Sequence, residues 1–200
     1  DFNSFDFIFG NSSFSLEKER WDFNRGARLS IDSACVVIQD LIIQNAQQSL
    51  QLAGMLYHAD TSEVYIEVHS FDLSSLNVFL GEDYVLKGIV DARASIRDPY
   101  HDVIFSSDIA VDSLIVNNRE IGNLSALSIW NPRKEELRID GRLEKDSLSA
   151  AGFNRYTPLS FAGYYRPNNE KSPLDLTATI NQLDLSFINA FMEPEILEIK

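Results

Sequence analysis

The three histidines are the side chains of this chain best suited to metal binding. His58, His69 and His101 lie in separate segments, and none has a second ligand at the spacing that a metal site uses. We therefore expect exposed histidines in turns or at strand edges, and the sequence predicts no metal site.

Two close pairs of glutamates are the next candidates for chemistry. Glu17 and Glu19, two residues apart, are expected on one strand face, and Glu135 and Glu136 straddle a turn beside the basic residues 133–134. A glycosidase needs two carboxylates that face each other across a cleft, and nothing in the sequence selects such a pair.

Nucleophile and phosphate motifs are absent from the sequence. Serines are plentiful, but no Gly-x-Ser-x-Gly elbow and no phosphate-binding glycine loop occurs. The single cysteine, Cys35, stands in "ACVVI", where we expect a small buried thiol. The sequence thus predicts a protein that is not an enzyme and binds no cofactor.

Composition excludes further classes of function. The chain has 30 acidic and 17 basic residues and a net charge of −13, which argues against binding to nucleic acid or to anionic membrane surfaces. No apolar run approaches the roughly 20 residues that span a bilayer, and no signal peptide is visible. We expect residues 1–200 to be one continuous segment of a longer protein, with membrane contact only through regions outside it.

Alternation of apolar and polar residues predicts strands. The segments 64–70, 103–111 and 136–143 each place apolar side chains on one face and more polar ones on the other, and turn signals separate such runs. This pattern is typical of antiparallel sheets. The predicted fold class is all-β, a long-stranded antiparallel meander with one or two short helices.

A nine-residue phrase occurs twice, as "FDLSSLNVF" at 71–79 and "LDLSFINAF" at 183–191. The similarity extends upstream, so that we predict an internal repeat of approximately 50–80 and 159–192 with a longer loop in the second copy. Each phrase predicts a short amphipathic helix, begun by Asp72 or Asp184 and ended by Gly81 or Pro194.

Glycine recurs at the fifth position of an apolar-x-apolar-x-Gly pattern. It stands at Gly54, Gly88, Gly141 and Gly163. Glycine weakens a strand, so its recurrence predicts a shared bend, a bulge or a close approach of the backbone. Such kinks suit a sheet that curls into an open half-pipe.

The repeated phrase, the glycine-containing strands and the run "SSDIAVDSLIVNNREIGNLSALSIWNPRKEELRIDGRL" at 106–143 resemble the TamB family. That family belongs to the AsmA-like group of Gram-negative envelope proteins. The resemblance implies a β-taco-like groove with a hydrophobic interior, in a protein that is anchored in the inner membrane and extends through the periplasm. It further implies inter-membrane phospholipid transport, outer-membrane biogenesis and, through the full-length protein, an Omp85-type outer-membrane barrel as a partner.

On that basis the apolar residues of the alternating strands are predicted to line a groove for phospholipid acyl chains. They are Leu50, Leu52, Leu56, Val64, Ile66, Val68, Phe105, Ile109, Val111, Leu137, Ile139, Leu143, Leu176 and Ile180. The sequence leaves open that they pack against one another as an ordinary core.

Other functions stay open as well. A surface or periplasmic β-solenoid or sandwich that binds carbohydrate or protein, or a purely structural spacer, would have similar strands. Aromatic side chains on the wet face would favour the binding module, whereas aromatic side chains on the dry face would favour the groove. The first strands contain six phenylalanines at both odd and even positions, which predicts that aromatic side chains are buried on both sides of these strands or form an interface. They are Phe2, Phe5, Phe7, Phe9, Phe14 and Phe23.

Overall fold

The computed structural model describes residues 4–33, 35–57, 62–81, 84–98, 103–149, 152–169 and 171–181. Strands form most of it. They are β1 (Ser4–Ile8), β2 (Ser13–Leu16), β3 (Glu19–Phe23), β4 (Arg28–Asp32), β5 (Cys35–Asn45), β6 (Gln48–Tyr57), β7 (Glu63–Asp72), β8 (Leu86–Arg97), β9 (Ile104–Val116), β10 (Arg119–Asn131), β11 (Glu136–Ser149), β12 (Gly152–Tyr165) and β13 (Leu174–Ile180). A 3-10 turn (Leu73–Leu76) continues into the short helix α1 (Asn77–Leu80) between β7 and β8.

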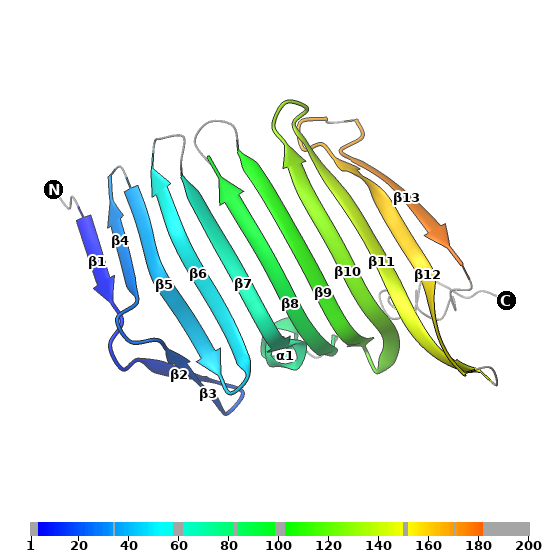
Figure 1. The fold of residues 1–200 in the computed structure, drawn as a ribbon, viewed down its shortest axis with the longest axis horizontal. Helices are drawn as coiled ribbons and strands as arrows, with labels where there is room; N and C mark the ends of the chain where they lie inside the picture. Colours follow the sequence, from blue (N-terminus) through cyan, green and yellow to red (C-terminus); the bar gives the residue numbers. More distant parts are fainter. Residues whose placement is uncertain are drawn as a thin grey trace.

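All thirteen strands belong to one open antiparallel sheet (Figure 1). From β4 to β13 each strand pairs with the next along the chain, while β1 pairs with β4 and the β2–β3 hairpin joins the end of β5. The predicted all-β meander of long strands is therefore confirmed. The sheet is open along its length, and its curl is slight.

The two copies of the predicted repeat have the same strand register. In the first copy Leu50 pairs with Val68, and Gly54 pairs with Val64. In the second copy Leu159 pairs with Ile180 at the equivalent place, and Gly163, four residues further along as in the first copy, pairs with Leu176. The second predicted helix, 184–194, lies outside the described residues.

The recurring glycines do not all have the same role. A Cβ atom on Gly54 would overlap the carbonyl oxygen of Glu63, and one on Gly163 would overlap the equivalent oxygen of Asp175. Gly88 instead occupies a register shift between β8 and β9, and Gly141 lies beneath the ring of Phe161. The pattern thus marks two close backbone approaches, one bulge and one site covered by an aromatic ring.

Register shifts in several neighbouring strand pairs lie close to one row across the sheet. They interrupt the β7–β8, β8–β9, β9–β10 and β11–β12 ladders near a row of paired apolar residues: Val90, Val111, Leu124, Leu143 and Leu159. Bulges bend strands, and Figure 1 shows β10, β11 and β12 curving at this end. Val116 and Ile121, beyond the shifts, pack with Leu143 in a buried cluster. The main core of the described residues therefore lies where the strands bend.

Helix α1 and the preceding turn occupy the same end of the sheet, as predicted for 72–81 (Figure 1). The Asp72 carboxylate accepts a hydrogen bond from the Ser74 amide at 2.8 Å, and Gly81 ends the helix at a φ of 76°. Asn77 joins the helix to β8, since its amide donates to the Leu86 carbonyl at 3.0 Å and accepts from the Leu86 amide at 2.8 Å.

We expect Asn77→Ala to lower the free energy of unfolding by about 2 kcal/mol, because it leaves two partly buried backbone groups of Leu86 without their partner. Urea denaturation followed by circular dichroism measures the change. Val78→Ala on the same helix is the control, because Val78 is exposed. Equal effects of the two substitutions would show that the Asn77 side chain does not anchor the helix.

Candidate functional site

The strand register places all fourteen predicted lining residues on one face of the sheet, here called the apolar face. Directly paired residues point to the same side of a sheet, and this side alternates along each strand. Leu50, Val68, Ala92 and Ile109 form one continuous row across four strands. Three of the fourteen predicted residues are in this row, which continues through Ala126 and Gly141 to β13. The other eleven are an even number of residues along their own strands from it.

Between the register shifts near Leu143 and the opposite end of the sheet, the apolar face of β6 to β13 has no charged side chain. The uninterrupted strand pairing of this part is here called the regular ladders. The central rows across these strands contain Leu, Ile, Val, Phe, Ala and Gly, and their polar side chains are Ser107 and Ser128. These two serines are paired across β9 and β10, and their hydroxyls form a hydrogen bond of 2.5 Å. Each serine thus satisfies the other, so the face offers few free hydrogen-bonding groups.

The apolar face has no second layer over it among the described residues. Each strand contacts its neighbours in the sheet, and the turn before α1 contacts β8. Several apolar side chains in the middle and at the β13 edge remain accessible: Ile66 is 36% exposed, Ile109 37% and Ile180 55%. At the bend Leu143 is only 1% exposed. The face is therefore a packed core at one end and an open apolar surface elsewhere.

The opposite face, here called the charged face, has ion pairs between and along strands. Glu67 and Arg93 lie 3.2 Å apart across β7 and β8, and Arg138 pairs with Asp140 at 2.7 Å along β11. The hydrogen bond that Arg138 donates to Asp140 raises the pKa of Arg138 above its ordinary value. Exposed pairs of this kind contribute little stability, so their main consequence is that this face is well hydrated.

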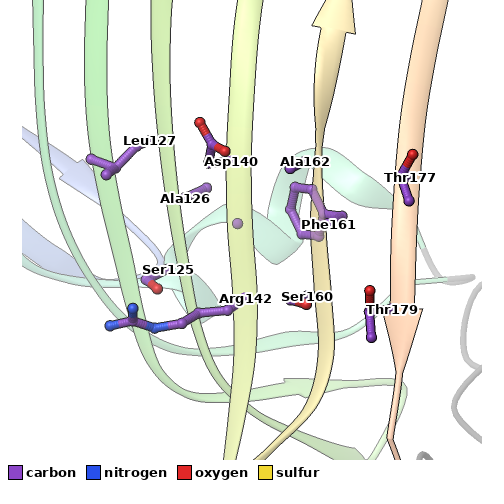
Figure 2. A pocket seen from close by; sticks show the side chains of 11 residues that line it. Ser125, Ala126, Leu127, Asp140, Arg142, Ser160, Phe161, Ala162, Thr177 and Thr179 are labelled. Carbon is purple, nitrogen blue, oxygen red and sulfur yellow. The ribbon is translucent and has the colours of Figure 1, made fainter.

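A shallow hollow of about 370 Å³ lies over β10 to β13 (Figure 2). Charged-face residues form most of its wall, among them Ser125, Asp140, Arg142 and Thr177. Figure 2 shows Phe161 beside β11, where Gly141 leaves room for its ring. The hollow is open to solvent, and the Asp140 carboxylate in its wall is hydrogen-bonded to Arg138.

The aromatic side chains at the ends of β10 and β12 are divided between the two faces of the sheet. Trp130 and Tyr165 lie on the apolar face, as their ladders with β11 show. Tyr164 lies on the charged face, where the Arg166 guanidinium covers its ring at 5.1 Å. This distribution favours the groove over a sugar-binding platform.

The first strands contribute a continuous aromatic cluster. Phe9 stacks on Phe23 at 4.9 Å, Phe14 bridges Phe23 and Trp21, and Trp21 contacts Phe71 of β7 at 5.9 Å. Trp21 is 2% exposed. Phe5 and Phe7 are about half exposed on β1, at the edge of the sheet, and Phe2 lies outside the described residues. Phenylalanines at odd and even positions can meet in this cluster because some of them belong to the β2–β3 hairpin, which lies off the main order of strands.

The candidate chemical residues are dispersed. His69 is exposed and lies 2.8 Å from Asp91, whereas His58 and His101 lie outside the described residues. The expectation that Glu17 and Glu19 share a strand face is wrong, since Glu17 lies in the β2–β3 turn at a φ of 50°. Cys35 is half-buried at the start of β5, not fully buried as expected.

The buried member of the second glutamate pair has a structural partner. Glu136 is 6% exposed and accepts a hydrogen bond from Arg166 at 3.0 Å. In the part of the chain that the structure describes, no three His, Cys, Asp or Glu side chains are grouped so that they could hold a metal ion.

Sequence reasoning missed part of the apolar face. Leu124, Ala126 and Trp130 of β10 lie on it, as do Leu159 and Phe161 of β12. Their alternation is present in the sequence, but alanine, serine and glycine interrupt its apolar positions. The apolar-x-apolar-x-Gly pattern, which aligns Leu159 and Phe161 with Leu50 and Leu52, would have found those two.

No helix within the described residues has the length and apolar character that crossing a membrane requires. The chain matches no protein-family model, no curated protein and no solved structure. The resemblance to the TamB family therefore stays a prediction.

Proposed function

We propose that the apolar face shields lipid acyl chains from water. The observation that supports this best is a sheet whose one face has no charged side chain along its regular ladders from β6 to β13 and no second layer among the described residues. An exposed apolar surface of this extent marks a place where another apolar molecule binds.

The energy of covering an acyl chain is large enough to explain such a surface. Each methylene removed from water is worth about 0.8 kcal/mol, so a chain of about sixteen carbons gains on the order of 12 kcal/mol. Eight neighbouring strands at about 4.8 Å span roughly 35 Å. Half of a bilayer core is only about 15 Å thick, so the face is wider than one acyl chain is long.

The chemistry of the face suits movement more than fixed binding. Aliphatic and aromatic contacts are non-directional, and the two central serines hydrogen-bond each other. A bound chain would therefore meet few groups that hold it in one register, and it could shift along the face without breaking hydrogen bonds.

In the whole protein this segment would serve inter-membrane phospholipid transport and outer-membrane biogenesis. The proposal follows the TamB and AsmA-like resemblance of the sequence, with an inner-membrane anchor, a periplasmic location and an Omp85-type barrel partner supplied by regions outside this chain. No nucleic acid is expected as a partner of a chain with a net charge of −13.

Photo-crosslinking in cells that make the full-length protein tests the proposal. A photoreactive residue at Ile66 or Ile139 is on the apolar face, and one at Glu67 or Arg138 is its matched control on the charged face, one residue away. We expect phospholipid adducts from the first pair and few from the second, as measured by mass spectrometry of the purified protein.

The other possible outcomes separate the alternatives. Equal labelling from both faces would contradict the proposal. Protein adducts without lipid at Ile66 and Ile139 would indicate a protein-binding surface, and the absence of any adduct would indicate a structural spacer.

A further inference from the structure

A second hollow, of about 500 Å³, lies between two loops at the end of the sheet away from α1. One loop is the β10–β11 turn, 132–135, and the other is the β12–β13 connection, 166–173; Figure 1 shows them close together. The hollow is lined by Lys134, Glu135, Arg166, Asn168, Asn169 and Lys171. Polar and charged side chains therefore converge here from separate parts of the chain.

The two loops have a small net positive charge in an otherwise acidic chain, with four basic residues against Glu135 and Glu170. The two loops contain Arg133, Lys134, Arg166 and Lys171. Arg133 and Lys171 are exposed and form no ion pair with any residue that the structure describes. Two cationic side chains are thus available to an anionic ligand beside the hollow.

A buried carboxylate holds the other two basic side chains in place. Glu136 is 3.0 Å from Arg166 Nε and 3.5 Å from Lys134 Nζ. Its hydrogen bond raises the pKa of Arg166 above the ordinary value, so the guanidinium stays charged. Arg166 is also fixed over the Tyr164 ring and near Asp175. The wall of the hollow is therefore preorganised.

Acceptors lie in the same hollow. The Glu135 carboxylate accepts a hydrogen bond from the Asn168 side chain at 2.9 Å and is otherwise exposed. Cations beside a carboxylate suit a group that has both a phosphate and an amine.

The hollow lies at the end of the sheet where Tyr165 and Leu174 of the apolar face also lie, although the Arg166 guanidinium itself packs over Tyr164 on the charged face. Arg166 directly follows Tyr165, which pairs with both Leu137 and Leu174 on that face. Tyr165 and Leu174 are 41% and 54% exposed. Because the sheet is a single layer, a ligand at its end can reach the loops with one part and the apolar face with another.

We propose that this hollow, here called the rim site, binds the phosphate-bearing headgroup of a lipid whose acyl chain lies on the apolar face. Lys171 and Lys134 contact the phosphate, since both line the hollow and the Lys134 side chain stays 66% exposed despite its pairing with Glu136. Glu135 accepts a hydrogen bond from an amine of the headgroup. The inference rests on the proposed function, because it takes the acyl chain as already bound.

The test compares three ligands on the purified chain: lysophosphatidylethanolamine, a monoacylglycerol with the same chain, and inorganic phosphate. We expect the lysophospholipid to bind more tightly than the monoacylglycerol. The double substitution Lys134→Gln and Lys171→Gln should weaken lysophospholipid binding about tenfold and leave monoacylglycerol binding unchanged. The matched control is Lys18→Gln with Lys87→Gln, which removes the same charge from the β2–β3 turn and from β8.

Each result has a distinct meaning. If no single-chain lipid binds, the proposed function fails. If both lipids bind equally and neither pair of substitutions discriminates between them, the rim site fails while the proposed function stands. Equal losses from both double substitutions would also overturn the rim site, since net charge alone would explain them. Phosphate binding as tight as that of the lysophospholipid would indicate a free-anion site and overturn the lipid assignment.

Discussion

The substitution Gly54→Ala should lower the free energy of unfolding by about 3 kcal/mol or more, a large part of the stability of an ordinary domain. Gly54 has a φ of 133°, a backbone conformation that residues other than glycine rarely adopt. Its added Cβ would also overlap the Glu63 carbonyl oxygen and lie 2.7 Å from the Val64 Cα. Both atoms belong to the backbone of β7, so relief requires separating β6 from β7.

Urea denaturation measures the loss, and Gly10→Ala is the matched control. A Cβ on Gly10 would have nothing within 4 Å, and its φ is not in the left-handed region. We expect Gly10→Ala to change the unfolding free energy by less than about 0.5 kcal/mol. A small effect at Gly54 would show that β6 and β7 do not approach each other as closely as described.

Urea denaturation of Gly141→Ala distinguishes a glycine that lies against backbone atoms, such as Gly54, from one that lies against a side chain. An added Cβ there would meet the ring of Phe161, which is a side chain and can move. The cost should therefore be smaller at Gly141 than at Gly54. Sequence alone predicted one shared role for these glycines, because the pattern records spacing along a strand and not what lies across it.

The face assignment was the part of the site that the sequence predicted best. Alternation has a period of two, so each strand fixes which of its own residues lie together. Leu52, Ile66 and Leu176 are far apart in the chain, yet their ladders place them on one face. The alternation in the sequence predicts such a face well, because the face depends only on side chains alternating along each strand and on neighbouring strands pairing in a consistent register.

Features that depend on contacts across the sheet were not predictable. The bend near Leu143 arises from register shifts in several ladders, and those shifts depend on how neighbouring strands align. The cluster around Trp21 depends on a hairpin that leaves the main sheet order. The rim site joins two loops separated by about thirty residues, and the sequence placed Glu136 at a turn without indicating that it is buried.

A charge placed on the apolar face should abolish acyl-chain binding. We expect Ile109→Asp to weaken the binding of a fluorescent monoacylglycerol by at least about tenfold, because a carboxylate against an acyl chain loses its hydration. Ile109 is 37% exposed, so the aspartate can stay hydrated in the free protein and the fold should tolerate it. The neutral ligand excludes charge repulsion as the cause.

Ala110→Asp is the matched control for this substitution. It adds the same charge one residue away, on the charged face, where Ala110 is exposed and pairs with Asp91 and Ser125. Binding should remain within about twofold of the unmodified chain, and circular dichroism with urea denaturation should show both variants folded. Equal loss in the two variants would mean that the lipid recognises something other than the apolar face, and unchanged binding in both would leave that face without a role in lipid binding. Only a loss confined to Ile109→Asp assigns the acyl chain to one side of a single-layer sheet, because both substitutions add one carboxylate at neighbouring positions of β9 whose side chains point to opposite faces.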